Sequence, residues 1–322
     1  MINIGIVGYG NLGRGVEANL KNAPDMNLVG IFSRRNPDTL DTEAKAYHMD
    51  DILNFKDKID VLILCGGSRS DIPEQGPALA EHFNTVDSYD NHSQIPNHFE
   101  SIDTVAKAHK YVSIIATGWD PGLFSLNRLI GEAILPKGDT YTFWGEGLSQ
   151  GHGDAVRRVE GVKDGVQYTI PNTELIDQIH AGETVEYTSK SAHNRDVYVV
   201  LEEGADAEKV KNDIVTMPDY FEGYQTEVTF ITEEELHANH AGLPHGGRVI
   251  RSGETSPDMQ QVYEFGLNLG SNPEFTAAVN VAYARAAYKL HQEGLSGAQT
   301  VFDIAPKYLS PKSATDLRKE LL

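Results

Sequence analysis

The sequence predicts an α/β protein in which a parallel sheet covered by helices comes first and a second α+β domain with a mixed sheet follows. Three observations support this prediction. The first 120 residues alternate short β-rich runs with helical stretches, a glycine-rich turn follows the first run, and the helical crossovers lose their regular spacing after Pro121. Strands that alternate with helices at this spacing form right-handed crossovers and therefore a parallel sheet.

The expected elements of the first part follow from local composition. Residues 59–64 read IDVLIL and are almost wholly apolar, as a strand covered on both faces should be. Pro73 suits the first turn of a helix, where the N–H that proline lacks would have no partner. On such grounds we expect strands at residues 2–7, 27–32, 59–64, 85–87 and 111–116, a turn at 8–13, and helices at 14–21, 73–82 and 97–109.

The second part has a different rhythm. Candidate strands follow one another without regular helical crossovers, which predicts an open mixed or antiparallel sheet. A long helix at about 276–292 has apolar residues all round, and we expect it to pack back on the first part of the chain. The candidate strands are residues 140–144, 166–170, 197–201, 225–231 and 249–252.

Composition narrows the class of protein. The 322 residues are enough for two domains. Asp and Glu number 47 against 27 Lys and Arg, a formal charge of −20, so most of the surface would repel a polyanion such as DNA. No apolar run approaches the roughly 20 residues of a membrane helix, and no signal peptide is recognisable. Because Cys65 is the only cysteine, no internal disulfide can form. We expect a cytoplasmic protein that binds neither nucleic acid nor membranes.

The glycine-rich turn has the pattern G-x-G-x-x-G, which is weak alone but meaningful between a strand and a helix. Its glycines permit a tight turn, close approach of the backbone to a pyrophosphate, and close packing of helix on strand. The alternative is an ordinary βα turn. We predict a Rossmann-type dinucleotide-binding domain at residues 1–120 plus about 275–322, and a substrate-binding and dimerisation domain at 121–274. The cofactor residues of the turn are Gly8, Tyr9, Gly10, Asn11, Leu12 and Gly13.

The end of the second strand distinguishes NADP from NAD. Ser33 stands where NAD-binding folds usually place an acid for the ribose hydroxyl, and Arg34 and Arg35 follow it. No carboxylate stands at this strand end to repel a phosphate, and two guanidiniums can pair with a 2′-phosphate. We therefore predict NADP as cofactor, the alternative being a solvated arginine loop. Small residues after the third long strand leave room for it at the same sheet edge: Cys65, Gly66, Gly67 and Ser68.

Two further patterns do not lead to a function. Residues 147–151 match G-x-S-x-G, but a nucleophile elbow needs a central parallel sheet, which the dinucleotide domain already uses. His237, His240 and His245 lie close together in what reads as a loop, without the spacing of a zinc motif. We predict neither a serine nucleophile nor a metal site.

Two aspartates follow neighbouring strands of the predicted parallel sheet. Asp90 and Asp120 each lie just beyond a strand's carboxyl end, the edge at which the cofactor would bind. Paired carboxylates can bind an ammonium group and accept its proton as an imine forms. We predict that both are catalytic, the alternative being aspartates of turns or caps.

Nine stretches of the chain resemble the meso-diaminopimelate D-dehydrogenase family, and the resemblance covers nearly the full length. One departure is Gly66, where related chains often carry a larger residue. The stretches are 7–14 (VGYGNLGR), 30–35 (GIFSRR), 71–75 (DIPEQ), 87–92 (DSYDNH), 117–122 (TGWDPG), 142–145 (TFWG), 147–152 (GLSQGH), 213–220 and 244–247 (PHGG).

The resemblance implies a homodimer that carries out reversible oxidative deamination of the D-centre of meso-2,6-diaminopimelate with NADP, in lysine biosynthesis. It places Asp90 and Asp120 at the reacting amine. Further residues would bind the substrate: Trp119, Trp144, Gln150, Gly151, Thr169, Arg195, His245 and Asn272. Two alternatives stay open, namely an NADP-dependent dehydrogenase of other D-amino acids and a non-catalytic NADP-sensing protein.

Overall fold

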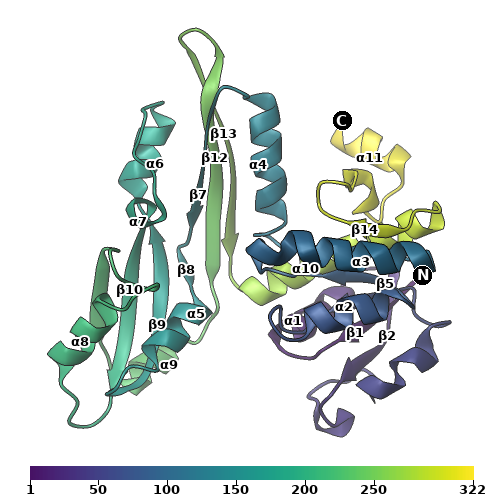
Figure 1. The fold of residues 1–322 in the computed structure, drawn as a ribbon, viewed down its shortest axis with the longest axis horizontal. Helices are drawn as coiled ribbons and strands as arrows, with labels where there is room; N and C mark the ends of the chain where they lie inside the picture. The colour runs from purple at the N-terminus through teal and green to yellow at the C-terminus, as the bar shows by residue number, and fades with distance from the viewer. The chain divides into compact units, whose positions relative to one another are not determined.

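The computed structural model separates the chain into two compact units (Figure 1). Unit 1 comprises Met1–Leu126 and Pro273–Leu322, and unit 2 comprises Asn127–Asn272. The structure describes residues 1–322, with the exception of the Gln150 side chain. Assignment of cofactor binding to the first unit and of substrate binding and dimerisation to the second stays a prediction.

Unit 1 is built on a seven-stranded parallel sheet, which confirms the predicted α/β class. The strand order is β14-β6-β5-β4-β1-β2-β3, so the chain reverses direction across the sheet after β3. The strands are β1 (Ile2–Val7), β2 (Met26–Ser33), β3 (Ala46–His48), β4 (Val61–Leu64), β5 (Asn84–Asp87), β6 (Val112–Ile114) and β14 (Gly297–Gln299). The helices are α1 (Asn11–Leu20), α2 (Ile72–Ala80), α3 (Ile95–His109), α10 (Asn272–Gln292) and α11 (Ala314–Leu321), with short 3-10 helices η1 (Pro37–Thr39), η2 (Met49–Phe55), η3 (His92–Gln94) and η4 (Pro306–Tyr308).

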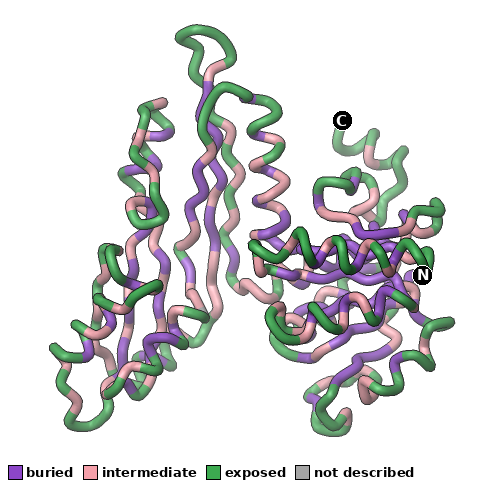
Figure 2. The backbone as a smooth tube through the Cα atoms, in the orientation of Figure 1, coloured by how far each residue is buried: buried purple, intermediate pink, exposed green. Residues whose placement is uncertain are grey.

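Both faces of this sheet are covered by apolar clusters. Successive side chains of a strand point to opposite faces, so neighbouring residues join different clusters. Ile63 of β4 joins a cluster with α1 and α10, whereas its neighbours Leu62 and Leu64 join a second cluster with α2. The central strands β1, β4 and β5 are accordingly drawn mostly as buried in Figure 2. Helix α10 buries ten residues and packs in the first of these clusters, which confirms the predicted return of the C-terminal helix to the first part of the chain.

Unit 2 contains two sheets rather than the single one expected. A four-stranded mixed sheet has the order β11-β10-β9-β8, and an antiparallel three-stranded sheet has the order β13-β12-β7. The strands are β7 (Gly138–Trp144), β8 (Gly147–Leu148), β9 (Val162–Pro171), β10 (His193–Leu201), β11 (Thr226–Phe230), β12 (His245–Ser256) and β13 (Met259–Leu269). The helices are α5 (Gln150–Val156), α6 (Thr173–His180), α7 (Ser189–Ala192), α8 (Ala207–Val215) and α9 (Glu233–Asn239), and α4 (Leu123–Ile134) begins at the end of unit 1.

Several expectations about individual elements were wrong. Helix α1 starts at Asn11 rather than Arg14, because the last residues of the glycine motif already form its first turn. Strand β13 was missed because most of its residues are exposed and its first half, residues 259–262, shows no alternation of apolar and polar side chains. The segment that carries His237 is helix α9, with a capping box at Thr232, and not a loop.

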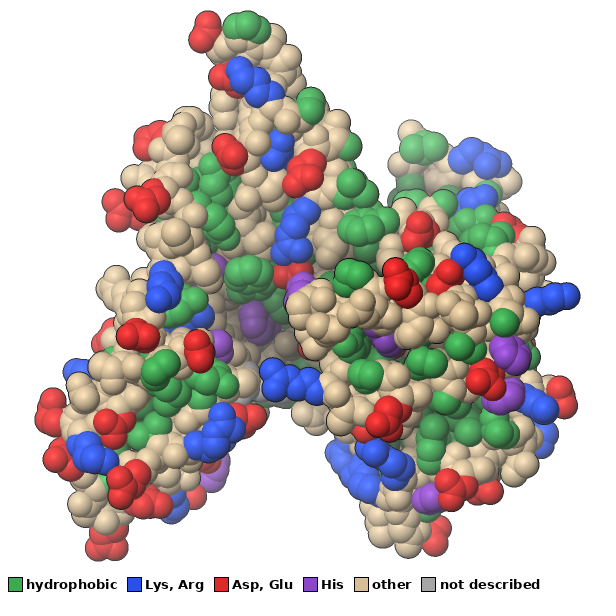
Figure 3. All heavy atoms as spheres, viewed as in Figure 1, with side chains coloured by type: hydrophobic (Ala, Val, Ile, Leu, Met, Phe, Trp, Pro, Cys, Tyr) green, Lys and Arg blue, Asp and Glu red, His purple; other side chains and the backbone are tan. Residues whose placement is uncertain are grey.

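The surface is of mixed charge. Acidic and basic side chains are interspersed on the face drawn in Figure 3. None of the helices in the described part of the chain is both long enough and apolar enough to cross a membrane.

Candidate active site

The glycine-rich turn joins β1 to α1, and its geometry explains two of its glycines. Gly8 has a φ of +91°, a backbone conformation that other residues rarely adopt. A Cβ on Gly13 would lie 2.3 Å from the carbonyl oxygen of Gly8, so no side chain fits where the helix crosses the turn. The first N–H groups of a helix lack intrahelical acceptors and bind anions readily. This end of α1, which begins with Asn11 and Leu12, therefore suits a pyrophosphate.

A cavity of about 340 Å³ opens beside this turn. Residues from the turn, from the end of β2 and from the loop after β4 line it together. Met49, Asp71 and Gln75 line it as well, and the Oε1 atom of Gln75 is buried without a hydrogen-bond partner. Of the predicted cofactor residues, the lining includes Gly8, Tyr9, Gly10, Ser33, Arg34, Arg35, Cys65, Gly66 and Gly67.

Both predicted phosphate-binding arginines border this cavity and are already engaged. Arg34 Nη2 pairs with Asp71 Oδ1 at 2.7 Å, and Arg35 Nη2 donates to the carbonyl oxygen of Tyr9. The Ser33 hydroxyl accepts from the Arg35 main-chain N–H at 3.1 Å, which fixes the bend after β2. The expectation that no carboxylate stands near the predicted phosphate site was wrong, because Asp71 reaches it from the loop after β4. A 2′-phosphate would have to share Arg34 with Asp71.

The loop after β4 is shaped by Asp71 as well. Asp71 Oδ2 accepts from the Gly67 N–H at 2.9 Å. A Cβ on Gly66 would lie 2.6 Å from the Asp71 Cβ, so the departure from the family pattern at Gly66 fits this loop conformation. Cys65 is buried, and burial raises the pKa of its thiol, which therefore stays protonated. Ser68 lies outside the cavity lining, but its Oγ accepts from the Asp90 N–H at 3.3 Å.

The loops after β5 and β6 carry Asp90 and Asp120. Asp90 is exposed, whereas Trp119 is 8% exposed and stacks edge-on against Phe124 with ring centroids 5.3 Å apart. The second loop is tightly folded, since the Leu123 N–H donates to the Gly118 carbonyl at 3.0 Å. Both loops therefore follow neighbouring strands of one sheet, as predicted.

Arg195 is the most distinctive of the predicted substrate residues in unit 2. It is 7% exposed, and its Nη1 donates to Thr169 Oγ1 at 2.5 Å, so β10 and β9 bring these two predicted residues together. The guanidinium lies 4.3 Å from the centre of the Tyr224 ring. Its Nε is buried without a hydrogen-bond partner, and burial lowers the pKa of Arg195. A buried guanidinium edge that lacks an acceptor suits a carboxylate ligand.

Trp144 is held by a histidine that the sequence analysis missed. The main-chain N–H of Trp144 donates to His193 Nε2 at 2.9 Å, so the proton of the His193 ring sits on Nδ1, which donates to the Ser189 carbonyl at 2.9 Å. The two rings stack at 5.4 Å, and burial lowers the pKa of His193. Trp144 therefore has a defined position at the end of β7.

The remaining predicted substrate residues also belong to unit 2. His245 starts β12 and receives the Gly246 N–H on Nδ1 at 2.8 Å, and burial lowers its pKa. Asn272 donates its main-chain N–H to the Leu243 carbonyl at 3.0 Å. Gly151 lies in the first turn of α5, and a Cβ there would meet open space. The predicted role of Gln150 lies outside the described residues.

The G-x-S-x-G stretch does form a strand, a turn and a helix, but at the edge of the mixed sheet. Ser149 Oγ lies 2.8 Å from His152 Nδ1. Burial, together with the charge of Arg195, lowers the pKa of His152 to about 4, so the ring is neutral at neutral pH. Among the residues that the structure describes, no three His, Cys, Asp or Glu side chains are grouped to hold a metal.

Several known proteins are similar to this chain. Residues 118–271 match the model of the diaminopimelic acid dehydrogenase C-terminal domain. The meso-diaminopimelate D-dehydrogenase of Ureibacillus thermosphaericus is 58% identical over 323 residues, which cover 100% of this chain and 99% of that protein. The structure of Corynebacterium glutamicum DAP dehydrogenase in complex with DAP has 47% identity and a TM-score of 0.90, covering 100% and 99% of the two chains. An engineered D-amino acid dehydrogenase bound to NADP+ has 46% identity and a TM-score of 0.84, again covering 100% and 99%.

Proposed function

The chain belongs to the meso-diaminopimelate D-dehydrogenase family, and from this premise we propose that it oxidises the D-centre of meso-2,6-diaminopimelate with NADP. The products are L-2-amino-6-oxoheptanedioate and ammonia, and the reaction is reversible and serves lysine biosynthesis. One observation carries the proposal: the 58% identity to a named family member extends over 100% of the chain, so the match spans both units.

The cofactor cavity of unit 1 fits a dinucleotide. The turn at Gly8 and the start of α1 would hold the pyrophosphate, and Arg34 and Arg35 would bind the 2′-phosphate. A related engineered enzyme carries NADP+, which supports this cofactor. When bound, NADP+ supplies the acceptor for the hydride.

The non-reacting L-centre of the substrate would be bound by residues of unit 2 and would thereby position the molecule. Its carboxylate would pair with Arg195, whose Nε is buried and lacks an acceptor while Thr169 holds Nη1. His245 and Asn272 would complete this end of the site. The buried Arg195 would select strongly for ligands with a carboxylate at this position, because a ligand without one leaves the guanidinium unpaired.

Asp90 and Asp120 would act at the D-centre. They bind the ammonium and accept one of its protons, so that the free amine can form an imine as the carbon loses hydride. Water then adds to the imine carbon and ammonia leaves. Asp120→Asn should lower kcat strongly while NADP still binds, and Asp90→Asn should act similarly. If kcat/KM stays within twofold, that aspartate is only a turn residue.

NADPH formation with each pure stereoisomer at a pH of about 9–10 tests the proposal, because more substrate amine is free there. We expect oxidation of meso-diaminopimelate and essentially none of the LL isomer. Comparable rates with both, or no rate with the meso compound, would contradict it. Turnover of other D-amino acids at higher rates would favour the broader dehydrogenase, and NADP binding without any turnover would favour a sensing role.

We also propose a homodimer in the cytoplasm. The family premise and the long, mostly exposed strand β13 of unit 2 support assembly through this unit. Light scattering at micromolar concentration should give about 70 kDa, twice the 35.4 kDa chain. A clean monomer would refute the dimer.

A further inference from the structure

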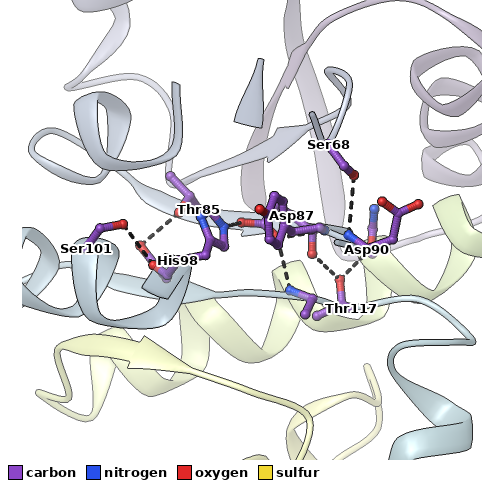
Figure 4. Close-up of polar contacts among 11 residues, drawn as sticks. Ser68, Thr85, Asp87, Asp90, His98, Ser101 and Thr117 are labelled. Atoms are coloured by element: carbon purple, nitrogen blue, oxygen red, sulfur yellow. Dashed lines mark hydrogen bonds and ion pairs between the residues drawn. The ribbon is translucent and has the colours of Figure 1, made fainter. Parts of the chain in front are cut away.

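One buried carboxylate joins the two loops that carry Asp90 and Asp120. Asp87 is the last residue of β5 and is 1% exposed. Its Oδ1 accepts from the Tyr89 N–H at 3.0 Å and from the Ala116 N–H at 2.9 Å (Figure 4). The first donor lies one residue before Asp90, and the second lies in the loop that leads to Asp120.

The other carboxylate oxygen is fixed by a histidine. His98 Nε2 of α3 lies 2.9 Å from Asp87 Oδ2, and the His98 residue is 5% exposed. The Tyr89 ring stacks on the His98 ring at 4.2 Å, so the same histidine also supports the loop after β5. Ser101 Oγ donates to the His98 carbonyl at 3.0 Å on the following turn of the helix. Both oxygens of the Asp87 carboxylate are thereby held, Oδ1 by the loop amides and Oδ2 by His98.

The backbone of the second loop depends on these contacts. Ala116 has a φ of +53°, a left-handed conformation that costs a non-glycine residue energy and persists only when its surroundings enforce it. Asp87 enforces it twice, since its main-chain carbonyl also accepts from the Thr117 N–H at 2.9 Å. The Thr117 hydroxyl donates to Asn280 Oδ1 at 2.5 Å, which ties the loop to helix α10.

We propose that Asp87, fixed by His98, is a positioning residue that sets the two loops of the reacting centre against each other. Loops move more than the elements they connect, whereas catalytic groups must be placed to a fraction of an ångström. A charged acceptor shared by both loop backbones meets this need, because charge-assisted hydrogen bonds are about twice as strong as neutral ones. This inference rests on the proposed function, since it assigns the catalytic carboxylates to these loops.

The test compares Asp87→Ala with Asp87→Asn and with a matched control. Asp87→Ala removes the acceptor of both N–H groups, and we expect kcat with meso-diaminopimelate to fall about tenfold or more while the Kd for NADP stays within about twofold. Asp87→Asn keeps an acceptor at Oδ1 and should stay within about threefold of the wild-type kcat. The control Thr85→Val removes a buried hydrogen bond of 2.8 Å to Ser113, between the same strands but away from the loops, and should leave kcat unchanged.

Two kinetic outcomes would overturn the proposal. One is a kcat for Asp87→Ala within twofold of wild type. The other is an equal loss of kcat in Thr85→Val, which would show that any defect between β5 and β6 has this effect.

Amide hydrogen exchange gives a readout that needs neither substrate nor the alanine variant. In Asp87→Asn the amides of Tyr89 and Ala116 should exchange about three- to tenfold faster, because a neutral acceptor replaces a charged one. The amide of Val86, inside β5, should not change. Unchanged exchange at Tyr89 and Ala116 would overturn the proposal. If wild-type enzyme failed to oxidise meso-diaminopimelate, the proposed function would fall, and exchange would still decide whether Asp87 holds the loops.

Discussion

The two units offer anions two different kinds of arginine. The Arg34 side chain in unit 1 is 69% exposed and already paired with Asp71, whereas Arg195 in unit 2 is 7% exposed and has no carboxylate partner among the described residues. A largely exposed guanidinium is screened by water and exchanges its partner at little cost. A buried guanidinium has lost its water, so it gains much more from one correctly placed carboxylate. Under the proposed function, we therefore expect moderate cofactor selectivity from Arg34 and stringent substrate recognition by Arg195.

The largest effect is therefore expected at Arg195. Arg195→Ala should lower kcat/KM for meso-diaminopimelate by a hundredfold or more, in line with about 3–5 kcal/mol for breaking a buried ion pair. NADP affinity should not change. Arg248→Ala is the matched control, since Arg248 makes an exposed pair with Glu264 at 3.0 Å in the same unit. A loss below tenfold at Arg195 would contradict the comparison.

A smaller effect is expected at the cofactor arginines. Arg34→Ala and Arg35→Ala should each weaken NADP binding about tenfold, from the loss of charge-assisted bonds of roughly 1.5–3 kcal/mol discounted for exposure. NAD has no 2′-phosphate, so its Kd should change much less. Titration of both cofactors checks this, and equal weakening of NAD and NADP would sink the assignment.

A further, smaller effect is expected at Tyr224, the aromatic neighbour of Arg195. Tyr224→Leu removes the ring that lies 4.3 Å from the guanidinium and should raise KM for meso-diaminopimelate about threefold to tenfold. Tyr224→Phe keeps the ring and should remain within about twofold of wild type. Equal effects of the two substitutions would show that the hydroxyl matters rather than the ring.

The smallest expected effect is on the pH dependence of stability, through the half-buried His152 of unit 2. The folded-state pKa of His152 is about 4, below its ordinary value of 6.5, because burial disfavours the charged ring. The folded state therefore binds fewer protons, and its free energy of unfolding falls as pH drops from about 6.5 towards 4. Urea midpoints at pH 7.5 and 5 should differ less in His152→Gln than in wild type. His193 and His245 act in the same direction, so part of the dependence should remain.

Local patterns predicted the parallel sheet of unit 1 well. The run IDVLIL and the glycine-rich turn are local patterns, which can be recognised from a few neighbouring residues. Unit 2 was harder, because β13 exposes most of its length and only its second half, residues 263–269, alternates apolar side chains with other residues. The start of α1 was misplaced for another reason: Gly13 opposes the carbonyl of Gly8 only because the helix has already begun.

The site divides in the same way. The glycines and Arg34 could be named from the sequence because each lies in a short run of neighbouring residues after a strand, but Asp71 reaches Arg34 across 37 residues. His193 and Tyr224 were missed because their roles, under Trp144 and over Arg195, exist only after the strands pair. Asp87 shows the same limit, since a lone aspartate at a strand end does not reveal that it holds a second loop 29 residues away.

Unit 1 is discontinuous, and this sets an order for folding during synthesis. Its first 126 residues emerge before unit 2, whereas α10 and β14 come last. Until then the face formed by Ile4, Ile6 and Ile63 lacks the helix that covers it, and β6 lacks its partner β14 at the sheet edge. Unit 2 is a single continuous segment with its own apolar clusters, so it can complete its fold on the ribosome while unit 1 still waits for its C-terminal fifty residues.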